Sequence, residues 1–181
     1  MPRVAARNLV FAACAAALSA CAPLPAEPTA ETVDERTGVT VARLARPIEL
    51  IVAEGRGSLS DPFAYLAPFE TNRMGERALY LWTAAPQEPT GASAPTLLAD
   101  GEAFAVTPVS GAVSELGLSQ APYAAPAPWS IEHYYRIDRP LLERLARASR
   151  VELIVPASDA ASQRYVADAA ALSPLLEFIA R

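Results

Sequence analysis

The chain has 181 residues, of which 52% are hydrophobic, and it carries 15 basic and 20 acidic side chains for a formal net charge of −5. This length suits one domain with a sizeable core. The acidic balance argues against a nucleic-acid-binding protein, which needs a basic face. All 15 basic residues are arginine, which we interpret as coding bias rather than function.

The first 20 residues have the layout of a secretory signal peptide. Arg3 and Arg7 precede the apolar run 9–18, which is too short to cross a bilayer as a permanent helix. The small residues Ser19 and Ala20 follow this run and fit a signal peptidase pocket. We therefore expect residues 1–20 to be removed and the remainder to be exported.

The stretch Leu18-Ser19-Ala20-Cys21 resembles the lipobox of bacterial lipoproteins, Leu-(Ser/Ala)-(Ala/Gly)-Cys, over residues 1–21 only. The resemblance implies that a diacylglycerol alkylates the Cys21 thiol, that the chain is cut before Cys21, and that the new amine is acylated with a fatty acid such as palmitate. Two or three acyl chains make a stable membrane anchor. Because Ala22 follows in place of aspartate, the resemblance implies a periplasm-facing protein of the outer membrane. Cleavage at an ordinary Ala-x-Ala site, with an incidental Cys21, is the alternative.

Residues 21–38 are rich in proline and acidic side chains, which favours a solvated tether over a packed core. Without the leader, the chain has 13 arginines against 20 acidic residues, a net charge of −7. Cys14 would leave with the leader, and the thiol of Cys21 would be blocked by lipid. We therefore expect residues 39–181 to form a single domain that packs without a disulfide bond.

Strand patterns dominate the middle of the chain. Apolar residues alternate with others over 39–52, with a break at Pro47. The run 77–84 is typical of a central strand covered on both faces. Asp100-Gly101, which lies between two apolar runs, predicts a hairpin. The segments 56–76 and 109–128 are interpreted as long loops.

The most regular strand pattern covers residues 129–137. Its side chains alternate between two faces with a period of two, as expected for a strand. One face carries Trp129, Ile131, His133, Tyr135 and Ile137, and the other carries Ser130, Glu132, Tyr134 and Arg136.

Helix patterns occur only in the last third. Over residues 138–149, Asp138 can cap a helix whose first turn contains Pro140. Strands follow at 151–156 and around 165–166, and a Ser-capped helix is predicted for 173–181. This order predicts an α+β fold, mainly an antiparallel β-sheet or sandwich with one or two short helices in the C-terminal third.

His133 is the only histidine and hence the first candidate for acid–base chemistry. Its apolar neighbours on the same strand face favour a neutral core histidine. A Ser-His-Asp triad stays open, although no G-x-S-x-G motif nominates a serine. One histidine without a free thiol argues against a metal site. Gly55-Arg56-Gly57 lacks the third glycine of a dinucleotide fingerprint, so we expect no nucleotide and no other cofactor.

Residues 62–77 are interpreted as part of a long loop that gathers aromatic and charged side chains, and such loops often bind something. Glu70 and Glu76 are two carboxylates of the kind that glycoside hydrolysis uses. Acids that alternate with arginines more often form ion pairs that order a loop, and we favour that interpretation. Asn72 or Gly75 would then supply a turn. The cluster comprises Phe63, Tyr65, Phe69, Glu70, Asn72, Arg73, Glu76 and Arg77.

Two function classes remain. The first is a non-catalytic envelope lipoprotein that binds another envelope protein or a ligand through the 62–77 segment and the exposed face of the 129–137 strand. The second is a periplasmic hydrolase of cell-wall or glycan substrates, with Glu70, Glu76 or His133 as the acid or base. The lack of a recognisable nucleophile, metal set or phosphate loop favours the first. Its candidate binding residues are Phe69, Glu70, Asn72, Arg73, Tyr134 and Arg136.

Overall fold

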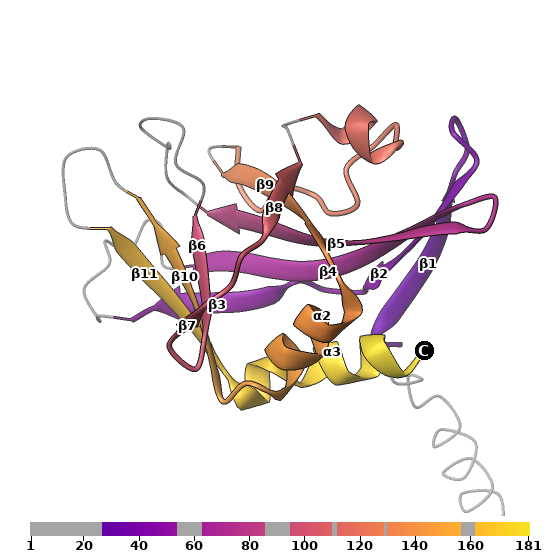
Figure 1. Cartoon of the computed structure of the whole chain (residues 1–181). Coiled ribbons are helices and arrows are strands. Elements are labelled where there is room, and N and C mark those ends of the chain that lie inside the picture. Colours follow the sequence, from indigo (N-terminus) through magenta and orange to yellow (C-terminus); the bar gives the residue numbers. More distant parts are fainter. Residues whose placement is uncertain (1–26, 54–62, 86–94, 110–111, 129, 157–161) are drawn as a thin grey trace, which may run out of the picture.

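A computed structural model describes residues 27–53, 63–85, 95–109, 112–128, 130–156 and 162–181. Within these ranges, eleven strands form one antiparallel sheet and two α-helices pack against it, which confirms the α+β class (Figure 1). The leader, Cys21, the Gly55-Arg56-Gly57 stretch and Trp129 lie outside the described residues.

The sheet begins earlier than expected, inside the segment interpreted as a tether. β1 (Thr29–Asp34) pairs with β2 (Val39–Leu44) along its whole length. β2 and β3 (Ile48–Val52) then lie end to end along one edge of β4 (Phe63–Arg73). The break between β2 and β3 falls at residues 45–47, where Pro47 cannot donate a ladder hydrogen bond.

β4 and β5 (Glu76–Ala85) form the longest hairpin of the sheet, with Arg73 opposite Glu76 at its tip. Residues 63–77 are therefore a strand hairpin and not a loop, and the loop prediction was wrong for these residues. β4 is buried on both faces over most of its length, so it lacks the one-sided alternation that signals a strand. The turn itself is as expected, because Asn72 Oδ1 accepts a hydrogen bond from Gly75 N at 2.9 Å and Gly75 has a φ of +96°.

The sheet curls into a half-barrel because a short stretch of chain joins the strands at its two edges. β6 (Thr96–Ala99) and β7 (Glu102–Ala103) form the hairpin predicted at Asp100-Gly101, and both turn residues have positive φ. The strand order β7-β6-β10-β11-β3-β4-β5-β9-β8 places β7 at one edge and β8 (Thr107–Val109) at the other. Only residues 104–106 join them, and that connection spans at most roughly 14 Å.

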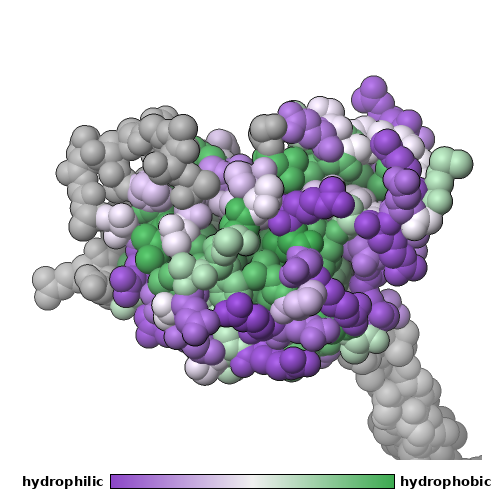
Figure 2. Space-filling view, in the orientation of Figure 1, coloured by the Kyte–Doolittle hydropathy of each residue, from purple (hydrophilic) through white to green (hydrophobic). Residues whose placement is uncertain are grey.

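The space-filling view shows the outside of this arrangement. Figure 2 shows hydrophobic surface in the middle of the face, around β8 and above α2, with hydrophilic side chains below it and to its right. The half-barrel thus presents apolar as well as polar surface on this side.

The C-terminal third adds three strands and both helices. Asp138 caps α2 as predicted, because its Oδ1 accepts a hydrogen bond from Leu141 N at 2.9 Å. These elements are β9 (Ile131–Ile137), α2 (Arg139–Arg147), β10 (Arg150–Val155), β11 (Gln163–Asp168) and α3 (Ala169–Ala180). Within the described residues, neither helix is long and apolar enough to cross a membrane.

α3 begins four residues before the predicted start at Ser173. Asp168 caps it by accepting a hydrogen bond from Ala171 N at 3.0 Å, and alanine, the best helix former, fills its first turn. Ser173 has a different role. Pro174 has no N–H to offer the Ala170 carbonyl, and the Ser173 hydroxyl donates to that carbonyl instead, at 2.8 Å.

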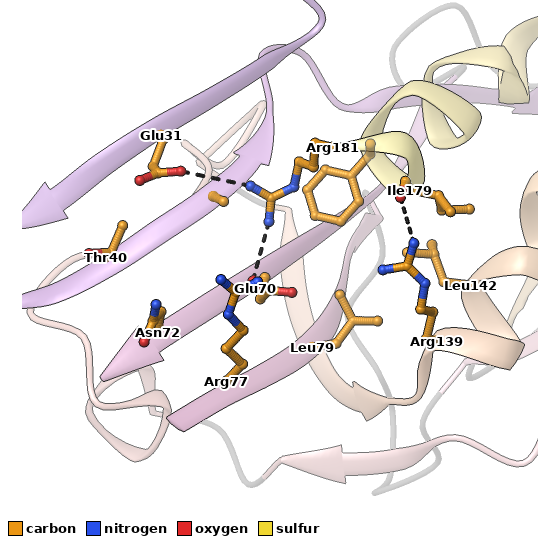
Figure 3. Close-up of a pocket in the computed structure, with 12 residues that line it drawn as sticks. Glu31, Thr40, Glu70, Asn72, Arg77, Leu79, Arg139, Leu142, Ile179 and Arg181 are labelled. Carbon is orange, nitrogen blue, oxygen red and sulfur yellow. Dashed lines mark hydrogen bonds and ion pairs between the residues drawn. The ribbon is translucent and has the colours of Figure 1, made fainter. Parts of the chain in front are cut away.

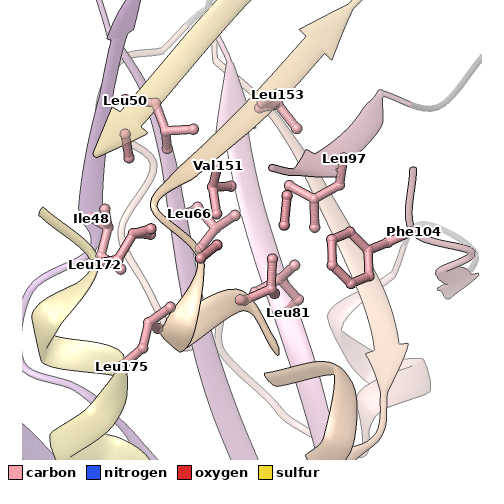
Figure 4. Close-up of a cluster of buried hydrophobic side chains, with 14 of the residues drawn as sticks. Ile48, Leu50, Leu66, Leu81, Leu97, Phe104, Val151, Leu153, Leu172 and Leu175 are labelled. Carbon is pink, nitrogen blue, oxygen red and sulfur yellow. The ribbon is translucent and has the colours of Figure 1, made fainter. Parts of the chain in front are cut away.

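The main hydrophobic core fills the concave face of the half-barrel, between the sheet and the two helices (Figure 4). Strands from all parts of the sheet contribute to this core, so the sheet and the two helices enclose it without a second sheet. Its members include Ile48, Leu50, Leu66, Leu81, Leu145, Val151, Leu153, Leu172 and Leu175.

A second, smaller core covers the convex face. The segment 112–123, which we call the convex cover, contains the 3₁₀-helix η2 (Val113–Leu116) and packs over β2, β4, β5 and β9. β9 is therefore covered on both faces, and Tyr134 is only 4% exposed, so the prediction that Tyr134 belongs to an exposed binding surface was wrong. The second core comprises Val39, Val41, Ala67, Phe69, Tyr80, Trp82, Ala84, Leu116, Leu118, Tyr123 and Tyr134.

Asp34 links the β1–β2 turn to the convex cover. Its carboxylate accepts hydrogen bonds from Ser119 N at 2.6 Å and from Ser119 Oγ at 2.7 Å, and further bonds come from the backbone of Arg36 and Thr37. These donors, Ser119 foremost, lower the pKa of Asp34 from 3.8 to about 2. The charged carboxylate is the form that the fold prefers.

Asp34→Asn is therefore expected to weaken the dependence of stability on pH. Because folding lowers the pKa of Asp34, its contribution is complete above about pH 4 and is lost as the pH falls toward 2. Urea unfolding of the parental chain and of Asp34→Asn between pH 6 and pH 2 measures this. Parallel stability curves for the two proteins over the acidic range would contradict the role given to Asp34.

Candidate functional site

The concave face becomes polar where it extends beyond the two helices. Leu66 on β4 belongs to the core, and further along the same face of that strand lie Glu70 and Asn72. On β5 the same face runs from Leu81 to Arg77. A hollow of about 410 Å³ lies between these strands and the ends of α2 and α3 (Figure 3). We call it the arginine hollow, defined by Glu31, Glu70, Arg77, Arg139, Phe178 and Arg181.

Glu70 is the central acid of the arginine hollow. Its Oε1 lies 3.5 Å from Arg77 Nη1 and 3.5 Å from Arg181 Nη2. Arg181 also reaches Glu31, with 4.0 Å between Nη1 and Oε2, and so stands between the two carboxylates. The predicted ion pairing of Glu70 is thus confirmed for Arg77.

Arg139 occupies the helix side of the hollow. Its Nη2 donates to the Ile179 carbonyl at 2.7 Å, and its Nε lies 3.4 Å from Glu143 Oε1 on the same helix. The side chains of Arg77 and Arg139 are 68% and 62% exposed, whereas those of Glu70 and Arg181 are 23% and 27% exposed. Two arginines therefore face solvent, and the third is held deeper.

The floor of the arginine hollow is apolar. It consists of Leu79, Leu142, Phe178 and Ile179, and two of these, Leu142 and Phe178, belong to the concave core. The Arg181 guanidinium lies 4.6 Å from the centroid of the Phe178 ring, a cation–π contact. The hollow thus combines a charged rim with a hydrophobic base that the main core supports.

The structure separates the binding residues that the sequence had grouped. Glu70 and Asn72 line the hollow, whereas Phe69 and Arg73 lie on the convex face of β4. Phe69 is fully buried and stacks on Tyr80, with ring centroids 5.1 Å apart. Arg73 donates from Nη2 to the Gly117 carbonyl at 3.3 Å, which ties the β4–β5 hairpin to the convex cover.

The two residues named on the 129–137 strand also have different positions. The Tyr134 hydroxyl donates to Glu132 Oε2 at 2.6 Å, and burial, more than Glu132, raises the pKa of Tyr134. Arg136 is exposed, as expected, and in the strand register it lies between Tyr80 on β5 and Thr107 on β8. They form no common surface with the arginine hollow.

The three candidate acid–base residues are not brought together. Glu76 lies opposite Arg73 in the register of the β4–β5 hairpin. Its side chain is on the convex face of the sheet, whereas that of Glu70 is on the concave face. His133 shares the concave face but pairs with Thr83, four residues along β5 from the partner of Glu70. Strand dimensions place the Cα atoms of His133 and Glu70 roughly 16 Å apart.

His133 lies at the margin of the concave core. It is half-buried, its ring stacks against Tyr135 at 6.2 Å between centroids, and burial lowers its pKa. Burial therefore favours the neutral imidazole.

Sequence reasoning missed the helix half of the site. Arg139, Glu31, Phe178 and Arg181 were not among the candidate site residues. These residues converge from β1 and from the ends of both helices, and no local pattern signals such a meeting. Within the described residues, no three His, Cys, Asp or Glu side chains lie close enough to hold a metal ion. No protein-family model, curated protein or solved structure matches the chain.

Proposed function

We propose that this chain is a lipid-anchored protein of the bacterial cell envelope, facing the periplasm from the outer membrane, and that its folded domain is a non-catalytic binding module. The binding site is the arginine hollow, and the bound species is a ligand or part of another envelope protein. The proposal combines the lipobox-like end of the leader with the geometry of the hollow.

The anchor would hold the folded domain close to the bilayer. Only seven residues lie between Cys21 and Thr29, the first residue of β1, and a fully extended chain between these two residues spans at most about 29 Å. Each acyl chain contributes about 0.8 kcal/mol per buried methylene, so two or three chains hold the protein stably.

The position of Arg181 is the observation that favours binding over catalysis. A glycoside hydrolase keeps the space between its two carboxylates free for the bond that it cleaves. In the arginine hollow the two carboxylates are Glu31 and Glu70, and the Arg181 guanidinium stands between them and pairs with both. The arrangement offers hydrogen-bond donors and an apolar floor, which are features of a ligand site.

Cys21→Ser is expected to abolish lipidation and to block cleavage before residue 21, because serine has no thiol for the diacylglycerol transfer. Cys14→Ser is the matched control, since it changes the other cysteine, inside the leader, and should leave processing intact. Membrane fractionation with detergent extraction, together with electrophoretic size, measures both effects. A Cys21→Ser chain that is processed and as resistant to extraction as the parental protein would contradict the proposed anchor.

A further inference from the structure

The arginine hollow carries positive charge on an acidic protein. Three arginines and two glutamates line it, which leaves one positive charge in excess, whereas the chain as a whole is at −5. One singly charged anion would neutralise the hollow. The local contrast therefore selects for an anionic ligand.

The ion pairs inside the hollow are long enough to be rearranged. The closest N–O distances between Glu70 and its two arginines are 3.5 Å, and a well-formed charged hydrogen bond is about 2.7–2.9 Å. Each guanidinium has five N–H donors in a planar fork that matches phosphate oxygens. Arg77 is largely exposed and can turn this fork toward an incoming anion. Arg139 is also exposed, and it keeps further N–H donors for an anion beside the one that its Nη2 gives to the Ile179 carbonyl.

The apolar floor distinguishes the ligand from a free ion. Leu79 and Ile179 are half-buried and line the hollow, and the buried side chains of Leu142 and Phe178 support them, so an anion bound by the rim carries its next atoms onto hydrocarbon. A volume of about 410 Å³ accommodates a headgroup with the start of an acyl chain, at the lower end of the usual ligand sites of about 300–1,000 Å³.

The hollow also lies at the end of the domain from which the tether departs. Glu31, on its rim, belongs to β1, and the ion pair with Arg181 places the end of α3 beside that strand (Figure 1). A domain anchored through Cys21 would therefore carry Thr29, two residues before Glu31 on the rim of the hollow, within about 29 Å of the lipid headgroups.

From these features we infer that the arginine hollow binds the phosphodiester headgroup of an anionic phospholipid, with the first part of an acyl chain on the apolar floor, where Leu79 and Ile179 are the accessible side chains. Arg77 and Arg139 are the main phosphate ligands, and Arg181, held by Glu70 and Phe178, contributes the deeper positive charge. This inference rests on the proposed function, because it names the ligand class of the same site.

Native mass spectrometry of the processed protein, extracted from membranes in a neutral detergent, tests the inference. The probes are phosphatidylglycerol and phosphatidylcholine with identical acyl chains, and inorganic phosphate as a competitor. We expect a phosphatidylglycerol adduct at least ten times tighter than the phosphatidylcholine adduct, which inorganic phosphate at equal concentration does not displace. Equal adducts of both lipids, or displacement by inorganic phosphate, would overturn a lipid ligand.

Variants assign the adduct to the hollow. Arg77→Gln combined with Arg139→Gln is expected to weaken the phosphatidylglycerol adduct at least tenfold. Arg144→Gln is the control, because Arg144 is on the same helix but pairs with Glu102 outside the hollow. It should change the affinity for phosphatidylglycerol by no more than about twofold.

Asn72→Asp adds a negative charge to the hollow and keeps the acceptor for Gly75 N, so it should weaken the adduct without unfolding the chain. Equal losses in Arg144→Gln and the double variant would overturn the assignment.

The same spectra separate this inference from the proposed anchor, because the protein mass reports lipid on Cys21 independently of the adduct. A lipidated chain without a selective adduct would overturn only the ligand assignment. A chain without lipid that still selects phosphatidylglycerol would contradict the anchor and support the ligand assignment.

Discussion

Tyr123→Ala is expected to lower the free energy of unfolding by about 3–5 kcal/mol, as for other large buried aromatic side chains. The Tyr123 ring is almost fully buried in the convex core, with its centroid 5.0 Å from Trp82 and 6.5 Å from Phe69. Arg43 lies over it at 5.4 Å. Removing the ring would leave a cavity between the convex cover and the sheet.

The Tyr123 hydroxyl has a separate role, which Tyr123→Phe isolates. It accepts a hydrogen bond from Leu44 N at 3.1 Å and donates to the Pro68 carbonyl at 2.6 Å. The β2–β4 ladder ends at the Arg43–Phe69 pair, and Leu44 and Pro68 would come next, so the hydroxyl replaces the next ladder bond where β2 gives way to β3. Burial raises the pKa of Tyr123, and the hydroxyl therefore stays protonated and able to donate.

Tyr123→Phe is accordingly expected to cost on the order of 2–4 kcal/mol, because it leaves one buried N–H and one buried carbonyl without a partner. Urea unfolding followed by tryptophan fluorescence measures both variants, since Trp82 contacts the Tyr123 ring. A loss below about 0.5 kcal/mol for Tyr123→Phe would show that the hydroxyl does not close the sheet at this point.

Leu175→Ala is expected to destabilise the fold by about 2–5 kcal/mol, because it removes a fully buried side chain through which α3 packs into the concave core. Leu176→Ala is a matched control on the next residue of the same helix. Leu176 is 49% exposed, and its truncation should change stability by about 0.5 kcal/mol or less.

Equilibrium unfolding of the two leucine variants under identical conditions measures the difference. The helix propensity of the two substitutions is the same, so the contrast reports burial alone. Similar losses at both positions would mean that α3 does not pack on the concave face as described.

Elements with one clear local signal were predictable from the sequence. The period-two pattern of β9, the Asp100-Gly101 hairpin and the Asp138 cap of α2 each depend on residues within one element. Their backbone conformations follow from local chemistry that tertiary contacts reinforce. The same reasoning placed the fold in the α+β class.

Errors arose where tertiary structure overrides a local signal. Residues 63–73 were assigned to a loop, yet they form β4. This strand tolerates Pro68 because Pro68 lies between the ladder segments that β2 and β3 form, where Tyr123 supplies the hydrogen bond. Tyr134 was expected at the surface because one face of β9 has a polar pattern, but the convex cover buries Tyr134 on that face. The cover itself has too little regular structure to be recognised from its sequence.

Only the part of the candidate site that lies on β4 and β5 could be predicted. Glu70, Asn72 and Arg77 were singled out because charged and polar residues cluster in one segment, and they do share the concave face. Arg139 and Arg181 reach the same hollow only because α2 begins there and α3 ends there. Sequence separation of this size leaves no periodic trace, so the convergence becomes visible only in the folded chain.

The mass of the mature protein purified from membranes tests the central claim most directly. The account predicts a chain that begins at Cys21 and carries a diacylglycerol on its sulfur, with a further acyl group on its amine. A mature chain that begins at another residue, or whose Cys21 keeps a free thiol, would contradict the account.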